Sequence, residues 1–373
     1  MPPLKGDVRV WRGSTLIAES RRALVTRFPE ATGHILIPED DVLTTALSSG
    51  VVARHDADRL VGFDPAQVKI EIDDSWPDGT GTVNRFPRWG DVADLLRLMD
   101  LVPTAPGLFV APTYEDTRRN VVEGSQLLGQ AIIAASKTVP HQRAISAHMI
   151  FSRPARFDLP LLFHVRKLRT GRSFSTVSVE AEQEEKSVGS ALVLMGSDTP
   201  DKIRNQITMP SLPGPEASPF HDYGMTGRDV RFVNGDYSPD PDRIGPPEIH
   251  AWVRHREAPA ARYLQQALLA QFTGHMTIAA ALLPHPGLGE AQAHVSLSTG
   301  VLAITVALHE EPDLTRWLLY SNPSIYSGRG LAQGEGHVFS EDGRLVASYT
   351  VQAMIRDFVD PPRSIGLDQA RLM

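Results

Sequence analysis

The chain has 373 residues, more than one ordinary domain needs, and its 42% hydrophobic and 22% charged residues are typical of a globular protein. The net charge of −7 and the lack of a dense Lys/Arg run argue against a nucleic-acid partner. No apolar run is long enough to span a membrane, and the absence of cysteine excludes disulfides and thiolate sites. The scattered histidines show no metal-binding spacing. We therefore expect a cytoplasmic protein with no membrane partner and no metal.

Short apolar runs separated by turns predict a small all-β domain over residues 1–75. The runs that carry this prediction lie at 8–11, 16–18, 23–25 and 35–38. This part resembles a small β-barrel family of unknown function, so it implies no activity. Residues 76–90 hold several Gly and Pro without periodicity, which predicts a linker.

The next part, residues 91–198, is predicted to be one long buried helix wrapped by an antiparallel sheet. Asp91 can cap a short helix that carries its apolar residues on one face. Residues 120–139 are apolar nearly all round, which indicates a buried helix. The β patterns that follow lie at 144–151, 161–168, 174–181 and 191–195.

The same order of elements recurs after a Pro- and Gly-rich stretch over 199–248, which we interpret as a long crossing connection. Residues 249–358 predict a second unit, and 359–373 a tail. Its elements are a strand at 249–254, a long helix at about 260–283, and strands near 294–297, 301–308, 317–320, 334–339 and 345–355. Gly-Arg opens a hairpin pattern at both Gly171 and Gly328, which favours a duplicated fold.

Several strings are similar to the acyl-CoA thioesterase II family across residues 91–358. They are VVEGSQLLGQAIIAASKTVP, AHMIFSRPARFDLPLLFHVRKLRTGRSFSTVSVEAEQ, RWLLYSNPS and GRGLAQGEGHVFSEDGRLVAS. The resemblance implies an α+β fold, a double hotdog in which two long helices are each wrapped by antiparallel sheet. It also implies hydrolysis of acyl-CoA thioesters by water that an Asp, a Thr and a Gln activate, with CoA present only as part of the substrate and no other cofactor.

The sequence departs from the family at all three of these positions. The family's Asp falls on Gly274, its Thr on Val301 and its Gln on Val351. Glycine cannot accept a proton, and valine has no polar side chain. The resemblance therefore implies the fold more directly than it implies the reaction.

Five polar residues are candidates to replace the missing groups. His275 follows Gly274 and titrates near neutrality, so it could act as a general base. Thr299 lies two residues before Val301 and shares its strand face, whereas Gln352 faces the other way unless the strand carries a bulge. Glu123 begins the first long helix, where a desolvated carboxylate could act as base or nucleophile. His148 lies on a strand and, facing the helix, could orient a substrate.

The candidate substrate-binding residues are Gly124, Ser125, Gln126, Arg153, Arg172 and Gly274. The backbone N–H groups of Gly124 and Ser125 could hold a thioester carbonyl at the helix N-terminus. Arg153 and Arg172 follow family patterns and could meet CoA phosphates, although solvated hairpin arginines are the more usual case.

Three functions stay open from the sequence. The first is hydrolysis of an acyl thioester. The second keeps the fold but changes the reaction to dehydration, isomerisation or cyclisation of an acyl or polyketide-like substrate. The third is a non-catalytic protein that binds acyl ligands. A homo-oligomer is compatible with each of them.

Overall fold

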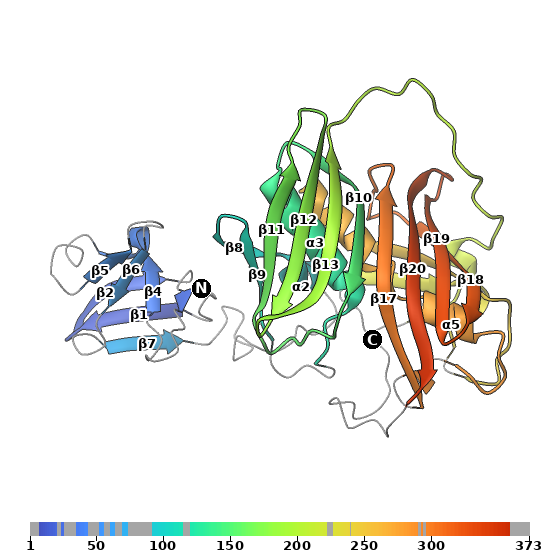
Figure 1. Ribbon diagram of the computed structural model, residues 1–373, viewed down its shortest axis with the longest axis horizontal. Coiled ribbons are helices and arrows are strands. Elements are labelled where there is room, and N and C mark those ends of the chain that lie inside the picture. The colour runs from blue at the N-terminus through green and yellow to red at the C-terminus, as the bar shows by residue number, and fades with distance from the viewer. Residues whose placement is uncertain are drawn as a thin grey trace. The chain divides into compact units, whose positions relative to one another are not determined.

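The computed structural model describes residues 7–20, 24–25, 35–43, 52–55, 60–63, 69–73, 92–114, 120–221, 227–238, 240–289, 292–293 and 296–358. The chain forms two compact units (Figure 1). One comprises Met1–Phe86 with Tyr114–Asp116, and the other Pro87–Thr113 with Thr117–Met373. The predicted linker at 76–90, the cap Asp91 and the tail at 359–373 lie outside the described residues.

The smaller unit is all-β in its described part, as the sequence predicts. Its two antiparallel sheets have the orders β2-β1-β7 and β3-β4-β6-β5. The strands are β1 (Asp7–Arg12), β2 (Thr15–Ser20), β3 (Leu24–Val25), β4 (Ile35–Pro38), β5 (Val52–His55), β6 (Leu60–Phe63) and β7 (Lys69–Asp73). Val8, Val10, Ile17, Ile37 and Val61 are buried within it.

The larger unit is built on one antiparallel sheet whose strand order is β14-β15-β16-β18-β19-β20-β17-β10-β13-β12-β11-β9-β8. These strands are β8 (Val102–Ala105), β9 (Leu108–Ala111), β10 (Arg143–Phe151), β11 (Leu161–Arg169), β12 (Phe174–Gln183), β13 (Lys186–Gly196), β14 (Phe220–His221), β15 (Arg228–Phe232), β16 (Glu248–His255), β17 (Leu297–Leu308), β18 (Leu318–Gly328), β19 (Leu331–Ser340) and β20 (Leu345–Asp357). The four strands next to the β10–β17 junction follow the same pattern on both sides, β10-β13-β12-β11 on one and β17-β20-β19-β18 on the other. This mirrored order confirms the predicted double hotdog.

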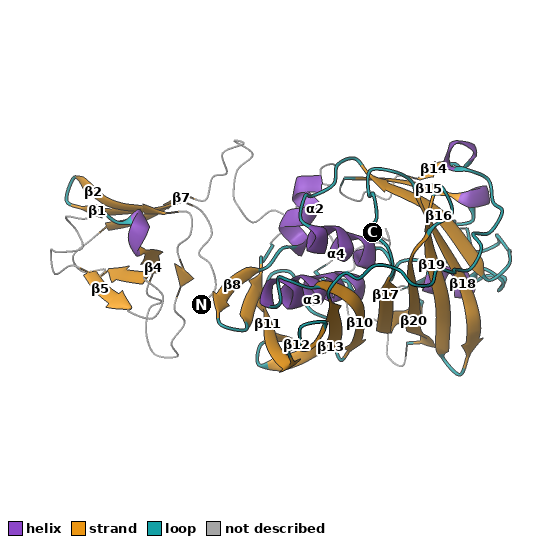
Figure 2. Cartoon of the chain, turned by 90° about the horizontal axis from the view of Figure 1, so that it is seen from above, coloured by secondary structure: helices purple, strands orange, loops and turns teal. Residues whose placement is uncertain are grey.

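Among the described residues of this unit, helices α3 (Gly124–Thr138), α4 (Arg262–Gln271) and α5 (Thr277–Leu282) lie against one face of the sheet (Figure 2). Helix α2 (Val92–Met99) packs on α3 and α4. Helix α3 is buried from Ser125 through Ser136, as its apolar sequence predicts. It packs closely on α4 at Gly129, where an added Cβ would lie 2.9 Å from the Ala267 carbonyl oxygen. Only glycine leaves room for this approach.

The prediction of one continuous helix over 260–283 is wrong, because the helix breaks between α4 and α5. Backbone bonds from Phe272 to Leu269 and from Thr273 to Ala270 replace the wider helical pattern there. The Thr273 hydroxyl also donates to the Ala270 carbonyl at 2.7 Å, and Gly274 favours helix poorly. Residues 272–276 therefore form an irregular segment inside the fold.

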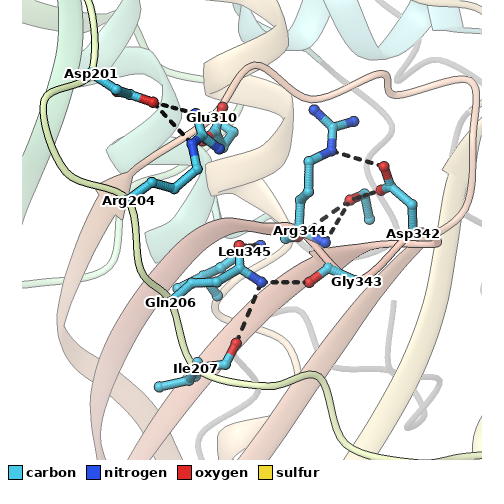
Figure 3. Close-up of polar contacts among 10 residues, drawn as sticks. Asp201, Arg204, Gln206, Ile207, Glu310, Asp342, Gly343, Arg344 and Leu345 are labelled. Carbon is cyan, nitrogen blue, oxygen red and sulfur yellow. Dashed lines mark hydrogen bonds and ion pairs between the residues drawn. The ribbon is translucent and has the colours of Figure 1, made fainter.

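The segment 199–248 is more than the crossing connection that the sequence predicts, since it contributes β14 and β15 to the sheet. Its first part, residues 199–214, which we name the strap, runs extended beside the second hotdog (Figure 3). Arg204 bonds Glu310 at 2.9 Å, and the Gln206 side chain bonds the Gly343 carbonyl at 2.7 Å. These contacts fix the strap to the β19–β20 hairpin and to the end of β17.

Candidate active site

Glu123 and His275 lie side by side at the first turn of α3. Glu123 is the N-cap residue, yet its side chain makes no capping hydrogen bond and instead places Oε2 3.4 Å from His275 Nε2. The side chains are 15% and 5% exposed, so Glu123 is the member that solvent reaches more easily. Two residues predicted as separate alternatives thus form one pair.

The surroundings of His275 fix how the pair can carry protons. Its ring stacks on Phe272, with centroids 4.8 Å apart, and its Nδ1 lies 3.3 Å from the Phe272 carbonyl oxygen. The contact between Nε2 and the carboxylate is an ion-pair distance rather than a hydrogen bond. A carboxylate and an imidazole at this separation can exchange a proton, directly or through a water molecule.

Gln271, at the end of α4, connects the pair to a buried cation. Its side-chain nitrogen donates to Glu123 Oε2 at 3.0 Å, and its side-chain oxygen accepts a hydrogen bond from Arg228 on β15. Arg228 also donates from Nε to His255 Nε2 at 3.2 Å, across the β15–β16 pair. All three of these residues are buried.

Burial changes the acid–base properties of this network. It lowers the pKa of Arg228 to about 10, a shift that the Glu123 carboxylate opposes, so Arg228 keeps its charge at neutral pH. Burial, together with the neighbouring Arg228, also holds the pKa of His255 well below its usual value. His255 is thus a neutral acceptor beside a buried cation.

Gly274 lies directly against the first turn of α3. A Cβ at this position would be 3.0 Å from both Cβ and Oγ of Ser125, and 3.3 Å from Cδ1 of Ile304 on β17. Ser125 thus takes the space that a side chain at position 274 would need. The first intrahelical bond of α3 runs from Leu127 N–H to the Glu123 carbonyl, so the amides of Gly124, Ser125 and Gln126 precede it.

Two family models match most of the larger unit. The acyl-CoA thioesterase N-terminal domain matches residues 113–196, and the acyl-CoA thioesterase C-terminal domain matches residues 206–355. The chain belongs to the acyl-CoA thioesterase family.

Individual relatives agree with this assignment. The chain is 29% identical over 260 residues to acyl-CoA thioesterase 2 of Haemophilus influenzae, covering 63% of this chain and 87% of that protein. It is 25% identical over 308 residues to acyl-coenzyme A thioesterase 8 of Rattus norvegicus, covering 75% and 94%. Among solved structures, an acyl-CoA thioesterase II from Mycobacterium marinum is 25% identical with a TM-score of 0.60, and the match covers 71% and 99% of the two chains.

Gly274, Val301 and Val351, the positions onto which the sequence resemblance places the family's Asp, Thr and Gln, lie around the β17–β20 pair. Gly274 lies over Ile304, and Ile304 pairs directly with Val351 across β17 and β20. Val301 pairs with Ala353, the next residue of β20 on the same face. Val351 is completely buried. The three positions therefore present no acid, base or hydroxyl group at this point of the fold.

Thr299 and Gln352 are not brought together. Thr299 is buried opposite Ile355, whereas Gln352 alternates with the buried Val351 and Ala353 and faces outward. Gln352 could share a face with Thr299 only if β20 carried a bulge. The bulge in this strand pair lies instead on β17, between residues 301 and 303. Gln352 therefore points away from the helices.

His148 does not face the helix, contrary to the sequence interpretation. It lies on the exposed face of β10, where its Nδ1 is 2.8 Å from the hydroxyl oxygen of Thr305. This contact crosses the β10–β17 junction between the two hotdogs. The position suits a structural contact between strands.

Arg153 and Arg172 are both exposed and lie far apart. Arg153 follows the end of β10 that pairs with Gly189, and Arg172 precedes the end of β12 that pairs with Gly196. Seven strand residues separate these ends, which corresponds to roughly 20–25 Å. Only Arg153 shares an end of the sheet with Gly124, since a Cβ at Gly124 would lie 3.0 Å from the ring of Phe151.

Gln126 is directed toward α2 rather than toward the Glu123–His275 pair. It is buried, and its side-chain nitrogen lies 3.5 Å from the Leu98 carbonyl, which also accepts a 3.0 Å bond from Gln130. Its backbone amide remains part of the first turn of α3.

Sequence reasoning did not identify Gln271, Arg228 or His255. Gln271 lies four residues before His275, a spacing that places two residues on one helix face, and this was the available signal. The sequence contains no such signal for Arg228 and His255, because only the pairing of their strands brings them together. No group of metal-binding side chains and no helix long and apolar enough to cross a membrane occurs among the described residues.

Proposed function

We propose that this protein hydrolyses acyl thioesters, acyl-CoA among them, and that the Glu123–His275 pair replaces the family's Asp, Thr and Gln. The observation that carries the proposal is the 3.4 Å contact between Glu123 Oε2 and His275 Nε2 at the first turn of α3. Membership of the acyl-CoA thioesterase family supports the substrate class. The reaction needs no cofactor beyond the CoA part of the substrate, and we expect it to take place in the cytoplasm.

In the proposed mechanism Glu123 acts as general base. The oxygen of a water molecule attacks the thioester carbonyl carbon while one of its protons passes to Glu123, with His275 available to share it. The amides of Gly124 and Ser125 stabilise the negative charge that develops on the carbonyl oxygen. The carbon–sulfur bond then breaks, the thiolate takes the proton, and a carboxylic acid and a free thiol leave.

The burial of the pair supports this assignment of roles. Glu123 is the more exposed member, so water and substrate reach it before they reach His275. Phe272 fixes the His275 ring by stacking and through its carbonyl, so that Nε2 lies 3.4 Å from the Glu123 carboxylate. A carboxylate oriented by a histidine can activate water without the family's Asp.

A changed reaction is the second candidate, and the loss of polar groups at positions 274, 301 and 351 favours it. A Glu–His pair can also remove a proton from carbon, which would lead to dehydration, isomerisation or cyclisation of an acyl substrate. A panel of acyl-CoAs of several chain lengths separates the two, with free thiol measured first and the acyl product identified by mass spectrometry. Free thiol supports hydrolysis. If the acyl group is altered but still attached to its carrier, the protein catalyses the second reaction and not hydrolysis. If acyl-CoA binds without turnover, the protein is an acyl-binding protein.

We also propose that the protein self-associates through the face of the sheet that the helices do not cover. Ile150, Leu192 and Leu194 are exposed on that face to 54%, 51% and 37%. Such a group of apolar residues is typical of an interface between sheets. Light scattering of the wild type and of Leu192→Lys measures this directly, and a monomer in both would contradict it.

A further inference from the structure

The two neighbours of Gln271, Arg228 and Glu123, fix which side its amide oxygen and its amide nitrogen face. Arginine only donates hydrogen bonds and an ionised carboxylate only accepts them. The side-chain oxygen of Gln271 must therefore face Arg228, which leaves its nitrogen for Glu123 Oε2 at 3.0 Å. The amide cannot turn over without losing both bonds.

Arg228 is held just as firmly. It donates from Nε to His255 at 3.2 Å, and its guanidinium lies 5.4 Å from the centroid of the Phe272 ring. Phe272 is also the residue whose ring stacks on His275 and whose carbonyl faces His275 Nδ1. Arg228 thus contacts the site along two routes, through Gln271 to Glu123 and through Phe272 to His275.

We infer that Gln271 and Arg228 form a positioning relay that fixes the Glu123 carboxylate against His275 and keeps it ionised. Neither residue touches the reacting atoms, so both are positioning residues and not catalytic ones. The inference rests on the proposed role of Glu123 as base. It also assigns a function to β15, which lies in the segment that connects the two hotdogs.

The charges around the carboxylate explain why the relay matters. A buried carboxylate is easier to protonate than an exposed one, and a protonated Glu123 could not accept a proton from water. A hydrogen bond from Gln271 and the charge of Arg228 both favour the ionised form. In the part of the chain that the structure describes, the titratable groups packed around the relay include His255, which is neutral, and Tyr320, whose hydroxyl donates to the Leu269 carbonyl.

Helix α4 provides a matched control for Gln271. Gln266 is 5% exposed and Gln271 is 4% exposed, and the side-chain nitrogen of each donates a 3.0 Å hydrogen bond. The acceptor is the Ala144 carbonyl for Gln266 and the Glu123 carboxylate for Gln271. For Arg228 the control is Arg254 on the neighbouring strand, which also lies over an aromatic ring, that of Trp317, and bonds Asp229.

The test compares Gln271→Met with Gln266→Met, and Arg228→Met with Arg254→Met, by the pH dependence of kcat/KM for acyl-CoA hydrolysis. We expect Gln271→Met and Arg228→Met to lower kcat/KM about tenfold or more. We also expect them to move the acid limb of the profile to higher pH by about one unit, because removing a donor or a cation makes the carboxylate easier to protonate. Both control variants should leave the limb in place.

An unmoved acid limb in Gln271→Met would overturn the relay, as would equal losses of activity in Gln271→Met and Gln266→Met. Thermal unfolding of each variant identifies any that fails to fold, and Gln271→Met decides the matter if Arg228→Met is lost. If the wild type releases no thiol, the proposed hydrolysis fails. In that case the relay is tested by NMR titration of the His275 imidazole. The relay predicts that the titration midpoint differs between Gln271→Met and Gln266→Met, and identical midpoints would refute it.

Discussion

Replacing Gly274 by Asp introduces the residue that the sequence resemblance places at this position, and we expect it to destabilise this protein. The new Cβ would lie 3.0 Å from Cβ and Oγ of Ser125, closer than ordinary van der Waals contact, and 3.3 Å from Cδ1 of Ile304. Ser125 is 3% exposed and Ile304 is completely buried, so neither can move into solvent. Overpacking of this kind together with a buried carboxylate that lacks a partner should cost about 2–4 kcal/mol.

Removing Ser125 should recover part of that loss, because its side chain is the obstacle. We expect Ser125→Gly combined with Gly274→Asp to be less destabilised than the sum of the single variants by about 1–2 kcal/mol. The assay is equilibrium unfolding in urea for the wild type, the two single variants and the double variant. Gly214→Asp is the control, since a Cβ there meets no atom within 4 Å. A Gly274→Asp variant as stable as the wild type, or strict additivity in the double variant, would refute the steric argument.

Three further predictions concern stability. Burial lowers the pKa of His255 in the folded protein. Below about pH 6.5 the unfolded chain therefore binds a proton at this residue that the folded chain does not. The free energy of unfolding should then fall by up to about 1.4 kcal/mol per pH unit. His255→Gln should reduce this slope in urea unfolding, and the exposed His164→Gln should not. Trp252→Phe removes the 2.9 Å hydrogen bond from the indole N–H to the Pro213 carbonyl. This should lower the free energy of unfolding by about 1–2 kcal/mol and speed proteolysis in the strap. An unchanged cleavage rate would contradict the prediction. Gly129→Ala forces a methyl group against the Ala267 carbonyl and should lower stability by about 1–3 kcal/mol, whereas Gly300→Ala, whose added Cβ meets its nearest atom at 3.5 Å, should have little effect.

The sequence predicted the elements whose periodicity is unbroken. Strand β12 alternates buried and more exposed residues along its length, and α3 is buried on all sides, as their patterns indicate. The break after α4 was missed because the apolar residues Phe272 and Met276 keep a helical i, i+4 spacing across it. Only the local competition of Thr273 and Gly274 with the helix ends it, and periodicity does not register that competition.

The site was predictable only in part, for a related reason. Glu123 and His275 could be selected singly, because Glu123 begins the first long helix and His275 follows Gly274. Their contact joins residues 152 positions apart in the chain and depends on the packing of the two hotdogs. Sequence alternation assigned Gln352 to the opposite face from Val351 correctly, but it could not say that His148 faces outward, since alternation alone does not identify the buried face.

The most direct test of the account is the rate of thiol release from acyl-CoA by the wild type, by Glu123→Gln and by Glu182→Gln. Glu182 is the matched control, because it lies 3.6 Å from His164 in an exposed Glu–His pair. We predict hydrolysis by the wild type, a loss on the order of 100-fold or more in Glu123→Gln with the fold intact, and no loss in Glu182→Gln. Full activity in Glu123→Gln would contradict the central claim that this carboxylate replaces the family's catalytic groups.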